Sequence, residues 1–418
     1  MNVDLLIHSA AQLLTLAGGP QRGAELGRLG IIEDGALAVR AGKIVAVGAS
    51  SEVTSQFRAD RELDATGKVV MPGFVDPHTH LIWVGDRADE FEMRIGGASY
   101  MEVMNAGGGI MSTVRKTREA GVDQLVEEAM PRIRRMLRHG TTTVEAKSGY
   151  GLETAAELRQ LEAIQRLGLA DVVDIVPTFL GAHALPTDYQ DKGNAYVEVI
   201  VKEMLPEVKE QAGDSPPFVD VFCEDGAFTL EQSRTILEHA SEMGFPLKIH
   251  ADEFVSLGGA GLAAELGAHS ADHLVVTPKE EMQVLGRSNT VAVGLPCTPF
   301  GLGQGKYTPA RDFLRANAIL AIATDLNPGT GWCESMQFVI ALACRYMKLS
   351  PAQAIAAATI NAAAAIGRAD GAGSLEEGKQ ADVLILDAPD YRHLGYRFGT
   401  NLVQTVIRHG RVVVEREV

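Results

Sequence analysis

The stretch GFVDPHTHL, residues 73–81, ends an apolar run with two histidines, His78 and His80, two positions apart. Because side chains alternate faces along a strand, histidines at this spacing point the same way and can bind one metal ion. Two structural histidines at a strand end would give the same pattern, so the pair alone does not establish a metal site. Whether His78 and His80 bind a metal ion therefore depends on which other residues the fold brings beside them.

Through the middle of the chain, apolar β-branched runs alternate with helical stretches, a pattern typical of βα units around a parallel sheet. A count of eight such runs favours a closed (β/α)8 TIM-like barrel over an open sheet. The runs are GFVDPHTHL, TTTVEAKS, DVVDIVPTFLGAH, FVDVFCED, PLKIHAD, SADHL, TVAVGL and ILAIATD.

The two ends of the chain have a different pattern of predicted secondary structure. Near the start, short strand-like pieces such as ALAVR and KIVAVG are separated by glycines without a long amphipathic helix. Near the other end, GSLEEGKQADVLILD and LVQTVIRHGRVVVE likewise alternate strands and turns. We expect residues 1–70 and 374–418 to build one small β-sandwich domain together, and residues 71–373 to form the barrel.

Composition excludes several classes of function. The net charge of -16 repels nucleic acid and anionic membrane surfaces, and the basic cluster after Pro131 (Arg132, Arg134, Arg135 and Arg138) fits a solvated helix face. Four scattered cysteines give no disulfide framework, and the start MNVDLLIHSA carries an acid where a signal peptide needs positive charge. We therefore expect a cytoplasmic protein with a small-molecule partner, and by default a homodimer.

Three further polar residues end predicted barrel strands. His250 ends PLKIHAD, His273 ends SADHL and Asp325 ends ILAIATD. Barrel chemistry gathers at the C-terminal ends of the strands, and three imidazoles with a carboxylate suit zinc or iron. Asp325 could instead cap a helix starting near Pro328, and Glu253, three residues after His250, could either transfer protons or open a surface helix.

The motif PGFVDPHTH, the chain-end segment GSLEEGKQADVLILD and the ordered strand tips together resemble the amidohydrolase superfamily, whose members are metal-dependent hydrolases on a (β/α)8 barrel with a small β-sandwich. The resemblance covers essentially the whole chain. The segments AGGGIMSTV, EAKSGYGL, PTFLGAH, KIHADEF, SADHL and DLNPGT are most similar to a branch that hydrolyses a cyclic amide bearing a propanoate tail.

This resemblance implies specific roles for individual residues. The implied metal ligands are His78, His80, His250 and Asp325, and the implied substrate contacts are Arg87, Tyr150, His183, Glu253, Asn327, Gly329 and Thr330. Two-metal relatives carry a bridging lysine on a middle strand, but FVDVFCED has none, so one zinc or iron ion per chain is expected. Lys147 ends the second strand and fits an ion-paired structural role better than a bridging one.

The expected chemistry is attack of an activated water on a ring carbonyl. His273 and Asp325 are expected to hold and deprotonate that water, and Glu253 to give a proton to the departing ring nitrogen. Which of these three is the principal base stays open. The triplet Gly107 to Gly109 is equally open, since it fits either a mobile loop over the site or a helix-terminating turn.

Two other functions are compatible with parts of this pattern. An aminohydrolase acting on a nucleobase or triazine would share the same histidine and aspartate series, but Arg87, Tyr150 and His183 form a set suited to a carboxylate tail, which a nucleobase lacks. A metal-free assembly protein of the same fold would typically lack the ligands, and here all four are present.

Overall fold

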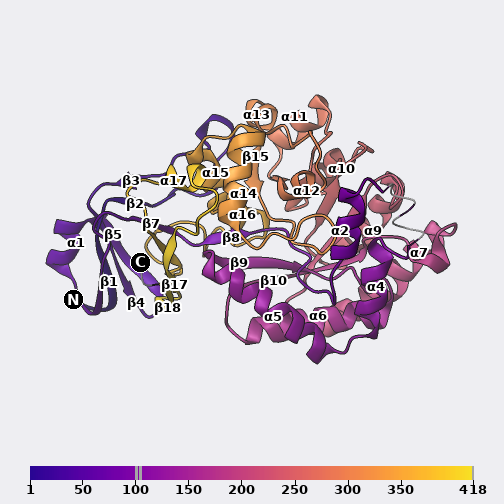
Figure 1. The fold of residues 1–418 in the computed structure, drawn as a ribbon, viewed down its shortest axis with the longest axis horizontal. Helices are drawn as coiled ribbons and strands as arrows, with labels where there is room; N and C mark the ends of the chain where they lie inside the picture. Colours follow the sequence, from indigo (N-terminus) through magenta and orange to yellow (C-terminus); the bar gives the residue numbers. More distant parts are fainter. Residues whose placement is uncertain (99–101, 103–105, 417–418) are drawn as a thin grey trace.

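The structure is a computed structural model that describes residues 1–98, 102 and 106–416. Figure 1 shows two parts, a β domain that contains both chain ends and a larger part in which strands are surrounded by helices.

The larger part is an eight-stranded parallel sheet in the order β15-β14-β13-β12-β11-β10-β9-β8. Its strands are β8 (Phe74–Asp76), β9 (Thr141–Lys147), β10 (Asp174–Ala182), β11 (Phe218–Cys223), β12 (Lys248–Ala251), β13 (Ser270–His273), β14 (Val291–Gly294) and β15 (Ile319–Ile322). The ends of the sheet meet just beyond β8 and β15, where Thr79 and Leu326 form a parallel bridge. The predicted eight runs and the barrel are thus confirmed.

Helices follow the strands and cover the outside of the barrel (Figure 1). The principal ones are α2 (Ala88–Ile95), α4 (Ile110–Glu119), α5 (Val122–Arg138), α6 (Thr154–Leu169), α7 (Gly193–Val199), α8 (Leu205–Ala212), α9 (Leu230–Glu242), α10 (Gly259–Glu265), α11 (Lys279–Arg287), α13 (Ala310–Arg315), α14 (Met336–Leu342), α15 (Pro351–Ala357) and α16 (Ile360–Ala365). Local sequence sets several of their starts. In α9, for example, Thr229 and Gln232 form a reciprocal capping box that satisfies backbone N–H groups at the first turn.

The β domain has two sheets. One has the order β5-β4-β1-β6, and the other has the order β18-β17-β16-β7-β2-β3, which joins strands from both ends of the chain. Their strands are β1 (Asn2–Ala10), β2 (Gln12–Leu14), β3 (Ile31–Ile32), β4 (Gly35–Arg40), β5 (Lys43–Ala49), β6 (Arg58–Asp64), β7 (Val69–Pro72), β16 (Val383–Leu386), β17 (Val403–Arg408) and β18 (Arg411–Glu415). Buried residues of both sheets, among them Leu5, Leu37, Val383 and Ile407, pack in one core, as a β-sandwich requires.

The exact domain limits, 1–70 with 374–418 and 71–373, stay our proposal. Strand β7 lies across the first limit, because it pairs with β2 and β16 of the β domain and leads directly into β8 of the barrel.

The prediction of a solvated helix face was wrong for Arg132, although Arg134, Arg135 and Arg138 are exposed. Arg132 is buried, whereas the cluster after Pro131 had suggested a solvated face. Its guanidinium lies 3.5 Å from the ring centroid of Trp83 and donates to the carbonyl oxygens of Leu81 and Trp83 at 3.1 Å each. A cation over an aromatic face can be buried because the ring and the carbonyls replace water. Arg132 thereby supports the segment that follows the two histidines.

Within the described ranges, no helix combines the length and the apolar character needed to cross a membrane.

Candidate active site

The predicted strand-tip residues meet at one end of the barrel. His78 and His80 follow β8, His250 lies on β12, His273 ends β13, and Asp325 comes just after β15. All five are at most 3% exposed. Parallel strands bring their carboxyl ends to the same rim, so residues far apart in sequence converge there.

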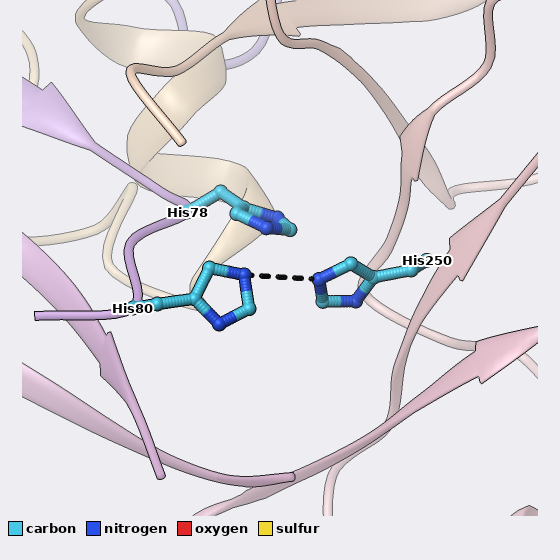
Figure 2. A group of neighbouring side chains, drawn as sticks. All are labelled: His78, His80 and His250. Atoms are coloured by element: carbon cyan, nitrogen blue, oxygen red, sulfur yellow. Dashed lines mark hydrogen bonds between the residues drawn. The ribbon is translucent and has the colours of Figure 1, made fainter. Parts of the chain in front are cut away.

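The converging atoms are close enough to share one ion. His250 Nε2 lies 3.3 Å from His80 Nε2, and Asp325 Oδ1 lies 3.4 Å from His80 Nε2 and 3.5 Å from His78 Nε2 (Figure 2 shows the three rings). Among the described residues, His78, His80 and His250 form one group whose possible ligand atoms lie within 4.8 Å of one another, and His78, His273 and Asp325 form another.

The chemistry of this cluster fits a transition metal. His78 Nε2 and Asp325 Oδ1 are buried and have no hydrogen-bond partner within the described part of the chain. Orphaned buried acceptors are costly unless a ligand satisfies them. Burial also lowers the pKa of His78 and His80, which favours the neutral imidazole that binds a metal ion.

Two carboxylates orient His78 and His250 through their Nδ1 atoms. Asp272 Oδ2 lies 2.6 Å from His78 Nδ1, and Asp220 Oδ2 lies 3.0 Å from His250 Nδ1. A partner on Nδ1 fixes the ring and leaves Nε2 to face the cluster. Neither aspartate is among the site residues predicted from the sequence. Asp272 precedes His273 on β13, and Asp220 lies on β11, the strand beside β12, which carries His250. Only this adjacency in the barrel identifies the two aspartates.

The expected structural role of Lys147 is confirmed. Its Nζ lies 2.6 Å from Glu145 Oε1 and 2.7 Å from Asp220 Oδ2, and all three side chains are fully buried. Burial by itself would lower the pKa of Lys147, but the charges of Asp220 and Glu145 outweigh it and raise the pKa. The lysine is therefore a charged partner of the carboxylate that contacts His250.

Glu253 and His273 lie together beside the cluster. Glu253 Oε2 is 3.6 Å from His273 Nδ1. Burial raises the pKa of Glu253 well above its usual range, with Asp325 and Glu224 adding to the effect, and burial lowers the pKa of His273 to about 3. His273 and Asp325 have left-handed backbone angles, with φ of 78° and 52°, and such strain is concentrated at functional sites.

Tyr150 and His183 lie on one side of His80. The His183 ring stacks on His80 with centroids 4.7 Å apart and an angle of 17°, and the Tyr150 ring lies 5.3 Å from His183. The carbonyl oxygen of Gly149 lies 2.9 Å from His183 Nδ1, which fixes that ring. The structure thus brings two of the predicted substrate contacts beside a predicted ligand.

The predicted contacts Asn327, Gly329 and Thr330 form a tight turn after Asp325. Asn327 Oδ1 accepts from the N–H groups of Gly329 and Thr330 at 2.9 and 2.8 Å, and its Nδ2 donates to the Asp325 carbonyl at 2.7 Å. The Asn327 amide therefore organises the turn. No helix begins at Pro328, so Asp325 is not a helix cap. Its Oδ2 instead accepts a hydrogen bond from Thr298.

Arg87 lies at the start of α2 and faces the same turn. Its Nε and Nη2 donate to Glu90 Oε2 at 2.8 and 2.7 Å. This ion pair is not a surface pair, since the side chains of Arg87 and Glu90 are only 16% and 11% exposed. The Gly107–Gly109 segment is held nearby, because the Gly109 N–H donates to Glu90 Oε1.

A (β/α)8 barrel with histidines and a carboxylate at its strand ends, joined to a β-sandwich, defines a class of metal-dependent hydrolases. The model of the amidohydrolase family matches residues 69–413, and the chain belongs to this family. Full-length relatives define the branch. The chain is 53% identical to a protein of Herpetosiphon aurantiacus named imidazolonepropionase, over 99% of this chain and 97% of the relative, and 49% identical to one of Chloroflexus aggregans with the same name, over 99% of each.

Solved structures show the same fold at much lower identity. An Escherichia coli guanine deaminase superposes with a TM-score of 0.74 at 18% identity, covering 99% of each chain. An adenosine deaminase of Xanthomonas campestris with bound zinc superposes with a TM-score of 0.73 at 20% identity, covering 99% of this chain and 93% of that one. These likenesses concern the fold alone. The deaminase alternative is not favoured, because relatives about half identical over their whole length carry the other name.

Proposed function

We propose that the chain hydrolyses 4-imidazolone-5-propanoate to N-formimidoyl-L-glutamate, a step of histidine degradation. The observation that carries this proposal is the near-full-length identity of 53% and 49% to relatives named imidazolonepropionase. The reaction is hydrolysis of a cyclic amide: water adds to the ring carbonyl carbon, the bond from that carbon to the ring nitrogen breaks, and the nitrogen leaves with a proton.

His78, His80, His250 and Asp325 are the residues that would hold the metal in this proposal. The converging atoms and the orphaned His78 Nε2 and Asp325 Oδ1 support the assignment. When bound, an ion there supplies Lewis acidity, which polarises a carbonyl and makes water a better nucleophile at neutral pH. We propose one ion per chain, zinc or iron, since three imidazoles and a carboxylate suit either.

Proton transfer is assigned to the residues around this cluster. Asp325 and His273 would orient the attacking water and accept its proton, and Glu253 Oε2 lies 3.6 Å from His273 Nδ1. Glu253, whose burial favours the protonated carboxyl, would give a proton to the departing ring nitrogen. Tyr150 and His183 border His80 and would contact the substrate.

The propanoate tail is assigned to Arg87 and the turn at Asn327, Gly329 and Thr330. Glu90 accepts from Nε and from one donor of Nη2, and within the described part of the chain Nη1 and the second Nη2 donor have no hydrogen-bond partner and could bind a carboxylate. A local cation is needed because the chain as a whole carries a charge of -16.

A single assay tests the proposal. Purified metal-loaded protein is mixed with fresh imidazolone propanoate, the ultraviolet absorbance of the ring is followed, and released ammonia is measured in parallel. We expect loss of absorbance without ammonia. Absence of turnover with the metal site filled, together with ammonia release from a nucleobase or triazine, would replace this function by deamination.

We also propose that the chain is a homodimer, the commonest arrangement of soluble oligomers. Sedimentation equilibrium of the metal-loaded protein tests this directly, and a monomer mass would exclude it.

A further inference from the structure

We infer that Glu90 is a positioning residue for substrate recognition: it holds the Arg87 guanidinium in the orientation that receives the tail carboxylate, and it ties that guanidinium to the Gly107–Gly109 segment. This inference rests on the proposed function. Among the described residues of the proposed site, Glu90 is the one that accepts two hydrogen bonds from Arg87.

The geometry divides the guanidinium into two edges. One edge, Nε with Nη2, donates to the single oxygen Oε2 of Glu90 at 2.8 and 2.7 Å. Nη1, at the other edge, lies against the turn after Asp325, because a Cβ atom at Gly329 would lie only 2.2 Å from it. Only glycine permits this approach. A planar fork held along one edge presents the opposite edge in a fixed direction.

The second oxygen of Glu90 has a separate task. Oε1 accepts from the Gly109 N–H at 3.0 Å and from Ser112 Oγ at 3.2 Å, at the start of α4. The carboxylate therefore bridges α2, which carries Arg87 at its start, and the glycine segment before α4. Its side chain is 11% exposed, so these hydrogen bonds are largely shielded from water.

A negative residue beside the substrate arginine would oppose an anion unless another cation offsets it. Arg94, one turn after Glu90 on α2, donates through Nη2 to the Gly329 carbonyl at 2.9 Å. Arg87, Arg94 and Glu90 together leave one positive charge at the turn. Glu90 can thus orient Arg87 without cancelling the attraction for a carboxylate.

The variant Glu90→Gln separates the two tasks. The amide oxygen of Gln can still accept from Gly109, but its NH2 group must then face the donors of Arg87, so both Arg87 hydrogen bonds are lost. We expect KM for imidazolone propanoate to rise about tenfold to thirtyfold with kcat within about twofold, because misplacement of the fork weakens uniform binding. The matched control Ser112→Ala removes a contact to the same carboxylate that does not involve Arg87, and it should leave KM unchanged.

Two comparisons distinguish positioning from a structural role. The propanamide analogue lacks the tail charge, so its kcat/KM should be the same in wild type and Glu90→Gln. In an Arg87→Met background, Glu90→Gln should change kcat/KM on the acid by less than about twofold, as expected for residues that act through one another. An equal loss on acid and amide, or the full loss in the Arg87→Met background, would overturn the inference.

Failure of the proposed function would be visible separately, as a wild-type protein that does not turn over the acid. Calorimetric titration with glutarate then decides the inference: weaker binding by Glu90→Gln supports it, and equal binding overturns it. If Glu90→Gln does not fold, Glu90→Asp keeps the charge on a shorter arm, and the ratio of acid to amide kcat/KM is read in the same way.

Discussion

Asp272 is the residue whose replacement tests the metal assignment most directly. Its Oδ2 lies 2.6 Å from His78 Nδ1, and both side chains are fully buried. Loss of such a partner typically lowers metal affinity by about ten- to a hundredfold, or about 1.4–2.7 kcal/mol. Asp272→Asn keeps an acceptor oxygen, and its metal affinity should fall about tenfold. Asp272→Ala removes the acceptor, and its metal affinity should fall about a hundredfold.

The assay is competition for Zn²⁺ against a chromophoric chelator, which gives Kd without any need for activity. Urea unfolding of the metal-free variants is measured in parallel, because Asp272 also lies 3.4 Å from the buried Lys248 Nζ and its loss should cost stability independently. Asp123→Asn, which changes an exposed carboxylate paired with Arg166, serves as the control and should leave Kd unaltered. A Kd within twofold of wild type in both Asp272 variants would refute the assignment of His78 as a ligand oriented by Asp272.

Three further outcomes are expected. Elemental analysis of active protein should find one transition-metal ion per chain, and two equivalents would contradict the single cluster. Glu253→Gln should lower kcat by about 10²–10⁴ with metal content unchanged, while loss of the ion would make Glu253 a ligand. Lys147→Met leaves the buried Glu145 and Asp220 without their cation and should cost about 3–5 kcal/mol in urea unfolding, against less than about 1 kcal/mol for the exposed Lys202→Met, so equal costs would contradict the buried network.

The barrel and its strand tips could be predicted because they depend on local patterns. A buried parallel strand has the sequence pattern of a short apolar run. The residue that ends the run lies at the carboxyl rim of the barrel, independently of how the helices pack. His78, His80, His250, His273 and Asp325 were found in this way, and the structure brings them together.

The orienting residues could not be found from local pattern, because their roles depend on contacts between distant segments. Asp272 is 194 positions from His78, and its neighbour His273 drew attention to the same strand without distinguishing which residue faces which ring. Arg87 and Glu90 are close in sequence, but whether their pair lies on the surface or against Gly329 is decided by how α2 packs over the barrel. Arg132 gives the clearest physical reason: a charged residue at helical spacing is normally solvated, and only the Trp83 ring and two carbonyl groups, brought to it by the tertiary fold, make its burial favourable.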